Sequence, residues 1–180
     1  NRAFFDSKDV WGTAKFLNDW LAENGIEIKH TEAELNPGAG ASVKMLWPNE
    51  QLYNNENLSD NDKSLVSLIE FAGVRILLCS DIEQFAQREL LRLNPDIKAD
   101  VIVVPHHGSA TTLDTGFLKH FDADVLICSC SRRQYKRMAG DTESVIYIPT
   151  ENRPLCTSED GAITVLVDKN GMTKTAVFTN

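Results

Sequence analysis

The chain has 180 residues, of which 42% are hydrophobic, and its formal net charge is −8. This length suits one domain with a real hydrophobic core, and no apolar run approaches the ~18 residues of a membrane-spanning helix. The acidic balance argues against a dedicated nucleic-acid-binding protein, which usually carries a basic surplus, although it leaves room for a local basic patch.

The first part of the chain is predicted to form one helix followed by short strands. Apolar residues recur at helical spacing over 8–24, which predicts an amphipathic helix. Short strands are predicted at 26–30 and at 42–48, and the stretch 49–63, rich in asparagine and aspartate, is predicted to be a loop. A hairpin is predicted about Ala72-Gly73, because an apolar run lies on each side of this pair.

The rest of the chain alternates between helical and strand patterns. An amphipathic helix is predicted over 82–93 and a shorter one over 114–121. The runs 99–105 and 123–130 are almost continuously apolar, which suits strands that are covered on both faces. A final hairpin is predicted about 169–171. This order of elements predicts a layered α/β domain with a mixed sheet.

Three of the predicted strands end in polar clusters, which are Ser80-Asp81, His106-His107-Gly108-Ser109 and Ser131-Arg132-Arg133. In open α/β sheets, ligands bind beyond the carboxyl ends of the strands, so neighbouring strands would bring these clusters together. Asp81 also precedes a predicted helix, where it could instead be an N-cap. A histidine pair that leaves a buried strand favours a functional site, whereas His30 and His120 are expected to be structural.

The supply of metal ligands at this predicted site is small. A catalytic zinc ion takes three protein ligands and a water molecule, and two-metal sites need more. The chain offers Asp81 and one or both of His106 and His107, and adjacent residues rarely reach the same metal. The four cysteines show no CxxC spacing and are expected to be reduced. We therefore expect no tightly bound metal in this chain.

Four stretches match the motif order of one known family. NDKSLVSLIEF (61–71) matches N-D-x-S-L-V and the hairpin after it, and LLCSDIEQFAQREL (77–90) matches L-L-T-G-D-I-E and the following helix. ADVIVVPHHGSATT (99–112) matches A-D-V-L-K-V-P-H-H-G-S, and TSEDGAITVLVD (157–168) matches a late T-x-x-x-G-A-I strand. This pattern covers most of 42–131 and returns near 157–168. It resembles the metallo-β-lactamase-like domain of the competence DNA-internalisation (ComEC) family.

The resemblance implies a fold, an activity and a set of site residues. The family fold is an αββα sandwich with the site between its two sheets, and the family activity is metal-dependent hydrolysis of a phosphodiester, here DNA. By this resemblance Asp81, His106 and His107 are the catalytic and metal-binding residues, and zinc or manganese is the metal. The parent family is membrane-bound with this domain exposed, so the chain is expected to be a soluble segment without membrane insertion.

Three departures from the family pattern bear on activity. The main metal motif, H-x-H-x-D-H, does not occur in residues 1–180, and the chain begins at Asn1 rather than at a methionine. We therefore expect a single partial domain, the C-terminal part of the sandwich, which is inactive on its own. Ser80 replaces the glycine before the aspartate, and Arg137 stands where the family has a histidine.

The sequence also allows two other functions. The chain could be a degenerate, non-catalytic scaffold or a nucleic-acid-contacting module of the same fold, which the arginine at position 137 favours. It could also be an unrelated α/β binding domain of flavodoxin-like layout, if the short motif matches arise by chance.

A basic cluster follows the last of the three strands, and it consists of Arg132, Arg133, Lys136 and Arg137. Most charge runs are solvated surface, which here would be a surface loop. Arginine also binds phosphate well, so the alternative is a phosphate-binding rim with weak affinity for DNA.

A partial sandwich would leave unpaired strand edges and an apolar face that need cover. The missing upstream half of the domain or a second copy of the chain could supply it. Within the chain, the predicted first helix carries Trp11, Phe16, Trp20 and Leu21. We expect this helix to be the main cover, with self-association as a supplement.

Overall fold

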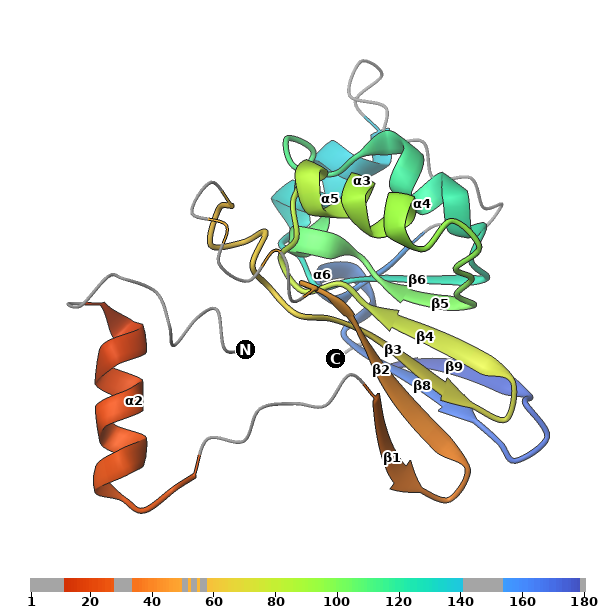
Figure 1. Ribbon diagram of the computed structural model, residues 1–180. Coiled ribbons are helices and arrows are strands. Elements are labelled where there is room, and N and C mark those ends of the chain that lie inside the picture. The colour runs from red at the N-terminus through yellow and green to blue at the C-terminus, as the bar shows by residue number, and fades with distance from the viewer. Residues whose placement is uncertain are drawn as a thin grey trace.

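The computed structural model describes residues 12–27, 34–49, 52, 55, 58–140 and 154–178. A seven-stranded sheet and a two-stranded sheet form its β-structure (Figure 1). The strands are β1 Glu34–Gly38, β2 Ala41–Trp47, β3 Val66–Phe71, β4 Val74–Leu78, β5 Val101–Val103, β6 Val125–Cys128, β7 Leu155–Cys156, β8 Ala162–Val167 and β9 Thr173–Phe178. The helices are α2 Thr13–Glu23, α3 Gln84–Leu93, α4 Thr115–Phe121, α5 Arg132–Gly140 and α6 Thr157–Asp160. The short 3-10 element η1, Pro105–Gly108, contains non-helical backbone angles at His106 and His107.

The strands of the large sheet lie in chain order from β1 to β7. Strands β1 to β4 pair with their neighbours antiparallel, whereas β4 to β7 pair in parallel. Parallel neighbours need crossover connections, and α3 and α4 lie within those that join β4 to β5 and β5 to β6. The predicted α/β class with a mixed sheet is thus confirmed. The flavodoxin-like alternative is wrong, because half of this sheet is antiparallel.

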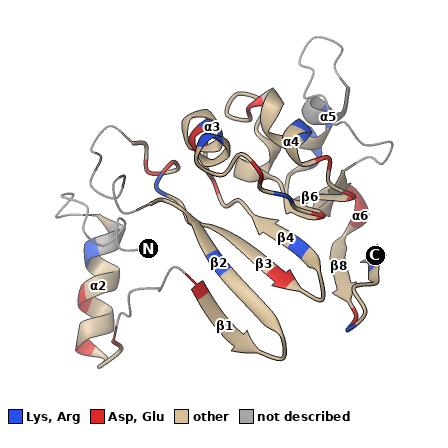
Figure 2. Ribbon diagram, turned by 45° about the vertical axis from the view of Figure 1, so that its right-hand side comes forward, with Lys and Arg blue, Asp and Glu red and all other residues tan. Residues whose placement is uncertain are grey.

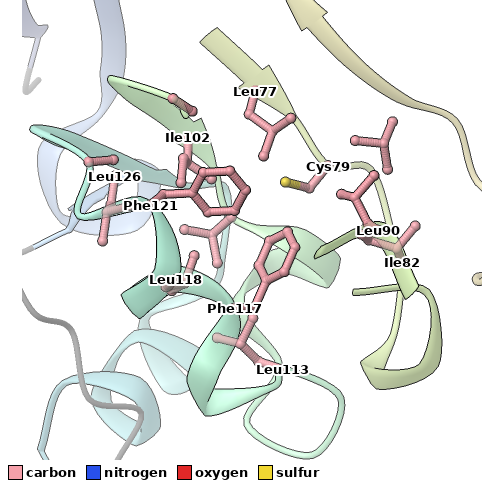
Figure 3. Close-up of a cluster of buried hydrophobic side chains, with 14 of the residues drawn as sticks. Leu77, Cys79, Ile82, Leu90, Ile102, Leu113, Phe117, Leu118, Phe121 and Leu126 are labelled. Carbon is pink, nitrogen blue, oxygen red and sulfur yellow. The ribbon is translucent and has the colours of Figure 1, made fainter. Parts of the chain in front are cut away.

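The main hydrophobic core lies between the sheet and the helices that cover one of its faces. Leu77, Ile102 and Leu126 are direct neighbours on β4, β5 and β6, and each is at most 4% exposed. Phe117 and Phe121 of α4 pack over them and meet edge to face, with ring centroids 5.2 Å apart (Figure 3). Strands β5 and β6 have only three and four residues, all of them apolar.

The two-stranded sheet lies on the opposite face of the large sheet from α3 and α4 (Figures 1 and 2). Its turn residue Gly171 has a φ of +77°, and a Cβ atom at that position would lie 2.5 Å from the carbonyl oxygen of Ala72 in the β3–β4 turn. The two turns are therefore in direct backbone contact. The second helix layer of the expected αββα sandwich is not seen in the described ranges.

The predicted first helix forms but does not cover the sheet. Helix α2 stands apart from the sheet in both views (Figures 1 and 2), and the side chains of Phe16 and Trp20 are 70% and 46% exposed. Instead, β1 pairs with β2 and extends the sheet at that edge, so the predicted covering role of α2 is wrong. Trp11 and the larger part of the predicted 26–30 strand, including His30, lie outside the described residues.

Helix lengths and hydropathy bear on membrane insertion. Within the described ranges, none of the helices combines the length and the apolar character needed to cross a membrane.

The contact between the two turns predicts that Gly171→Ala lowers the free energy of unfolding by about 2 kcal/mol, since the added methyl group meets backbone at a positive φ. Gly73→Ala is the matched control, because Gly73 also has a positive φ (+83°) but open space within 4 Å, and it should cost about 1 kcal/mol. Urea denaturation of both variants measures this difference. Equal losses would mean that the turns do not touch.

Candidate functional site

The parallel strands β4, β5 and β6 deliver their polar clusters to one edge of the sheet. The strands are in register, so the residues that follow them emerge side by side. The backbone N–H of His106 donates to the carbonyl oxygen of Ser80 at 2.9 Å, which joins the first two clusters directly. The third cluster begins α5, which packs against η1. The structure therefore brings together the loops in which the sequence places the candidate residues.

The backbone at this edge adopts the left-handed conformation at four positions. The φ angles are +50° at Ser80, +45° at His106, +55° at His107 and +70° at Gly108. Such angles are strained for residues other than glycine, and strain of this kind concentrates at functional sites. The Ser80 hydroxyl donates to the carbonyl oxygen of Leu65 at 2.8 Å, which helps to hold the turn. Glycine adopts a φ of +50° readily, which explains why the family that the sequence resembles has a glycine at the position of Ser80.

The His107 ring lies between a carbonyl group and a carboxylate. Its Nδ1 atom lies 2.8 Å from the carbonyl oxygen of Ser129, and because a carbonyl only accepts, Nδ1 carries the proton. The Nε2 atom lies 3.5 Å from Oδ1 of Asp81. In the neutral ring, Nε2 is therefore the unprotonated nitrogen, and it is the one that lies near this carboxylate. Metal-ligating histidines are commonly oriented in this way by a carbonyl behind the ring.

His106 belongs to a different network. Its Nδ1 atom lies 3.2 Å from the Thr112 hydroxyl and 3.6 Å from Oε1 of Glu83. The same Glu83 oxygen accepts a hydrogen bond from Asn61 Nδ2 at 2.8 Å. The two histidine rings meet edge-on with centroids 6.5 Å apart, so each faces its own carboxylate. Sequence reasoning missed Asn61, Glu83 and Thr112, although two of them lie in the matched N-D and D-I-E motifs.

Asp62, which sequence reasoning also missed, stabilises the start of α3 beside the site. Its side chain is buried at 6% exposure, and its Oδ1 accepts from the backbone N–H groups of Glu83 at 2.8 Å and Ala86 at 3.3 Å. These are the free donors at the start of α3, so Asp62 caps this helix from a distant loop. The alternative that Asp81 is the N-cap is therefore wrong, and the Asp81 carboxylate remains available to His107.

The basic cluster forms a helix rather than a loop, and its charge is partly neutralised. Arg132 Nε lies 2.7 Å from Glu159 Oε1, and this hydrogen bond lowers the pKa of the Glu159 carboxyl. Arg133 and Lys136 are exposed, whereas the side chain of Arg137 lies outside the described part of the structure. Figure 2 shows Lys and Arg interspersed with Asp and Glu over the described elements near this cluster.

The cluster of histidines and carboxylates is smaller than a complete metal centre. Across the described residues, no group of three or more histidine, cysteine, aspartate and glutamate side chains is placed to hold a metal ion. Asp81 and His107 supply two converging ligand atoms, one fewer than a catalytic zinc ion takes from a protein.

Fold and site together define an α/β protein with a histidine–carboxylate cluster beyond the carboxyl ends of its parallel strands. No family model matches the chain. The chain is 34% identical over 74 residues to ComE operon protein 3 of Bacillus subtilis (strain 168). This similarity covers 41% of the chain and 10% of that protein, so the chain corresponds to a small part of the relative that it matches.

The capping bonds predict that Asp62→Ala lowers the free energy of unfolding by about 2 kcal/mol, because the N–H groups of Glu83 and Ala86 lose their acceptor. Asp62→Asn keeps an acceptor oxygen and should lose less. Asp60→Ala is the matched control, since the Asp60 side chain is 99% exposed, and it should change stability by less than about 0.5 kcal/mol. Thermal melts test the ranking, which an equal effect of Asp60→Ala and Asp62→Ala would refute.

Proposed function

We propose that the chain is the C-terminal part of a competence-type, metallo-β-lactamase-like hydrolase domain whose substrate is the phosphodiester backbone of DNA. The observation that carries this proposal is the pairing of His107 Nε2 with Asp81 Oδ1 at 3.5 Å, with Nδ1 fixed by Ser129. The partial identity to ComE operon protein 3 supports the competence link. The order of the four matched motifs supports the hydrolase assignment.

In this proposal each residue of the site has a separate role. Asp81 and His107 would hold the metal, zinc or manganese, through Oδ1 and Nε2, while Ser129 keeps His107 in the required tautomer. A bound metal of this kind acts as a Lewis acid and lowers the pKa of a coordinated water. Glu83 and Thr112 orient His106, which could then ligate through its other nitrogen or polarise the substrate.

The layers of the fold are compatible with one half of a sandwich. One helix layer covers the large sheet, and the small β8–β9 sheet lies against its other face. In this proposal the remaining strands and ligands come from the upstream half of the domain or from a second copy of the chain. The isolated chain is therefore expected to show no nuclease activity with zinc or manganese.

A specific observation favours a second function, a degenerate and non-catalytic module of the same fold. Within the described residues only two ligand atoms converge, and Arg137 stands where the resembling family has a histidine. Such a module would contact nucleic acid through the basic cluster without cleaving it. Metal binding separates the two functions, because only the hydrolase requires Asp81 and His107 to act together.

For the hydrolase we expect weak metal binding that dialysis removes but thermal melting detects. Zinc at about a hundredfold above its Kd should stabilise the chain by about 2.7 kcal/mol, and Asp81→Asn or His107→Gln should abolish this gain. His120→Gln is the control, because His120 bonds to the carbonyl of Ile97 away from the site. Stabilisation that persists in both site variants, or none in the wild type, would favour the degenerate module.

Any affinity for DNA is expected to come from the basic cluster and to fall steeply with salt, because phosphate contacts release counterions. Charge reversal at Arg132, Arg133 and Arg137 should remove binding, and each lost contact should lower the salt slope by about 0.7 for single strands. Glu159→Gln should strengthen binding, since it frees Arg132. Fluorescence anisotropy with a labelled oligonucleotide measures both effects. Unchanged binding after charge reversal would exclude the phosphate-binding rim.

A further inference from the structure

Cys128 and Cys130 meet Cys156, which is distant from them in the sequence, at the border of the site. Cys128 ends β6, Cys130 follows it, and Cys156 ends β7 beside Cys128 in the parallel register. All three thiols are free and at most 8% exposed. The sulfur atoms of Cys130 and Cys156 lie 3.0 Å apart, whereas a disulfide bond is about 2.05 Å long. A small movement of two side chains would thus close the bond.

We propose that Cys130 and Cys156 form a redox-active dithiol that small-molecule disulfides oxidise to an intramolecular disulfide. Cys130 rather than Cys128 is assigned as the partner, because the short sulfur contact of Cys156 is with Cys130. The site does not depend on the proposed hydrolase function. It depends only on the pairing of β6 with β7 and on the loop that follows β6.

The surroundings of the two thiols shift their pKa values in opposite directions, so that one thiol ionises more readily than the other. The thiolate is the nucleophile in this chemistry. Burial opposes ionisation of Cys156, but hydrogen bonds from Ser158, Cys130 and backbone N–H groups outweigh it and lower the pKa of this thiol. Burial raises the pKa of Cys130 far above its ordinary range and that of Cys128 to about 11. This difference in pKa favours Cys156 as the attacking sulfur and Cys130 as the resolving one.

The exchange proceeds in two steps. The Cys156 thiolate attacks one sulfur of the oxidant disulfide, and the other half of the oxidant leaves as a thiolate. Cys130 then loses its proton to solvent and attacks the Cys156 sulfur, which releases the second half of the oxidant. Two thiols of the chain are oxidised, and one external disulfide is reduced to two thiols.

The bond would fix a part of the structure that borders the candidate site. Cys130 directly follows Ser129, whose carbonyl oxygen holds Nδ1 of His107. Cys156 begins the β7–α6 junction, and its backbone N–H donates to the buried carboxylate of Asp160 at 2.7 Å. The cross-link would tie these two segments together across 26 positions of sequence, and it would restrain the carbonyl that orients His107.

The test incubates the 180-residue chain in glutathione buffers of increasing oxidised fraction, followed by acid quenching, denaturation and alkylation with N-ethylmaleimide. Mass spectrometry should show four adducts in the reduced chain, which has four cysteines, and two in the oxidised chain, because the bond removes two thiols. Peptide mapping should join Cys130 to Cys156. The oxidised chain should also melt several degrees higher, since the cross-link restricts the unfolded state, and dithiothreitol should reverse the shift.

Three variants assign the roles. Cys79→Ala is the matched control, since Cys79 is buried and free but outside the cluster, and it should leave the bond intact. Cys130→Ala should retain one glutathione on Cys156, whereas Cys156→Ala should form neither the bond nor an adduct. Four adducts at every buffer composition, or a bond that includes Cys128, would overturn the proposal. The wild-type map decides this even if a variant fails to fold.

Discussion

The in-register parallel pairing of β4, β5 and β6 is the constraint on which the rest of the structure depends. Leu77, Ile102 and Leu126 lie next to one another and face the helices, and a slip of one residue would turn Ile102 to the other face. Since burial fixes this register, it also fixes where the strands end. The hydrogen bond from His106 to the Ser80 carbonyl continues the pairing beyond the strands. The positions of the polar residues are thus set by the apolar ones.

The elements that the sequence predicted well are those with strong apolar patterns, which are the buried strands and α3. The short elements η1, β7 and α6 are not predicted. Two longer elements, β1 and α5, were missed because their local pattern argues against them. Strand β1 contains Pro37 and Gly38, which strands disfavour, and it forms because β2 offers an open edge. Helix α5 is basic and polar at its start, so it was predicted as a loop. One of its residues, Tyr135, packs against the core, which local sequence does not reveal.

In the candidate site, too, the sequence reveals residues of unusual type but not residues whose role depends on contacts with distant parts of the chain. Asp81, His106 and His107 stand out in the sequence because such residues are uncommon at the end of a buried strand. Asp62 and Glu83 do not stand out, because their contacts span 21 and 23 positions of sequence, the first with the Glu83 N–H and the second with His106. The pairing of Cys130 with Cys156 is hidden for the same reason, since it depends on β7, a strand of two residues.

The start of α3 helps to explain how the Asp81 carboxylate can face a histidine, because Glu83 takes the N-cap position and Asp62 supplies the capping oxygen. An aspartate just before a helix ordinarily accepts from the first backbone N–H groups of that helix, and this would turn the Asp81 carboxylate away from His107. Asp62 occupies those donors instead, and Trp47 Nε1 holds the Asp62 carbonyl at 2.6 Å. The left-handed turn at Ser80 then directs Asp81 toward the sheet edge. The polar loop before β3 therefore positions the site indirectly, by satisfying a helix that would otherwise compete for its carboxylate.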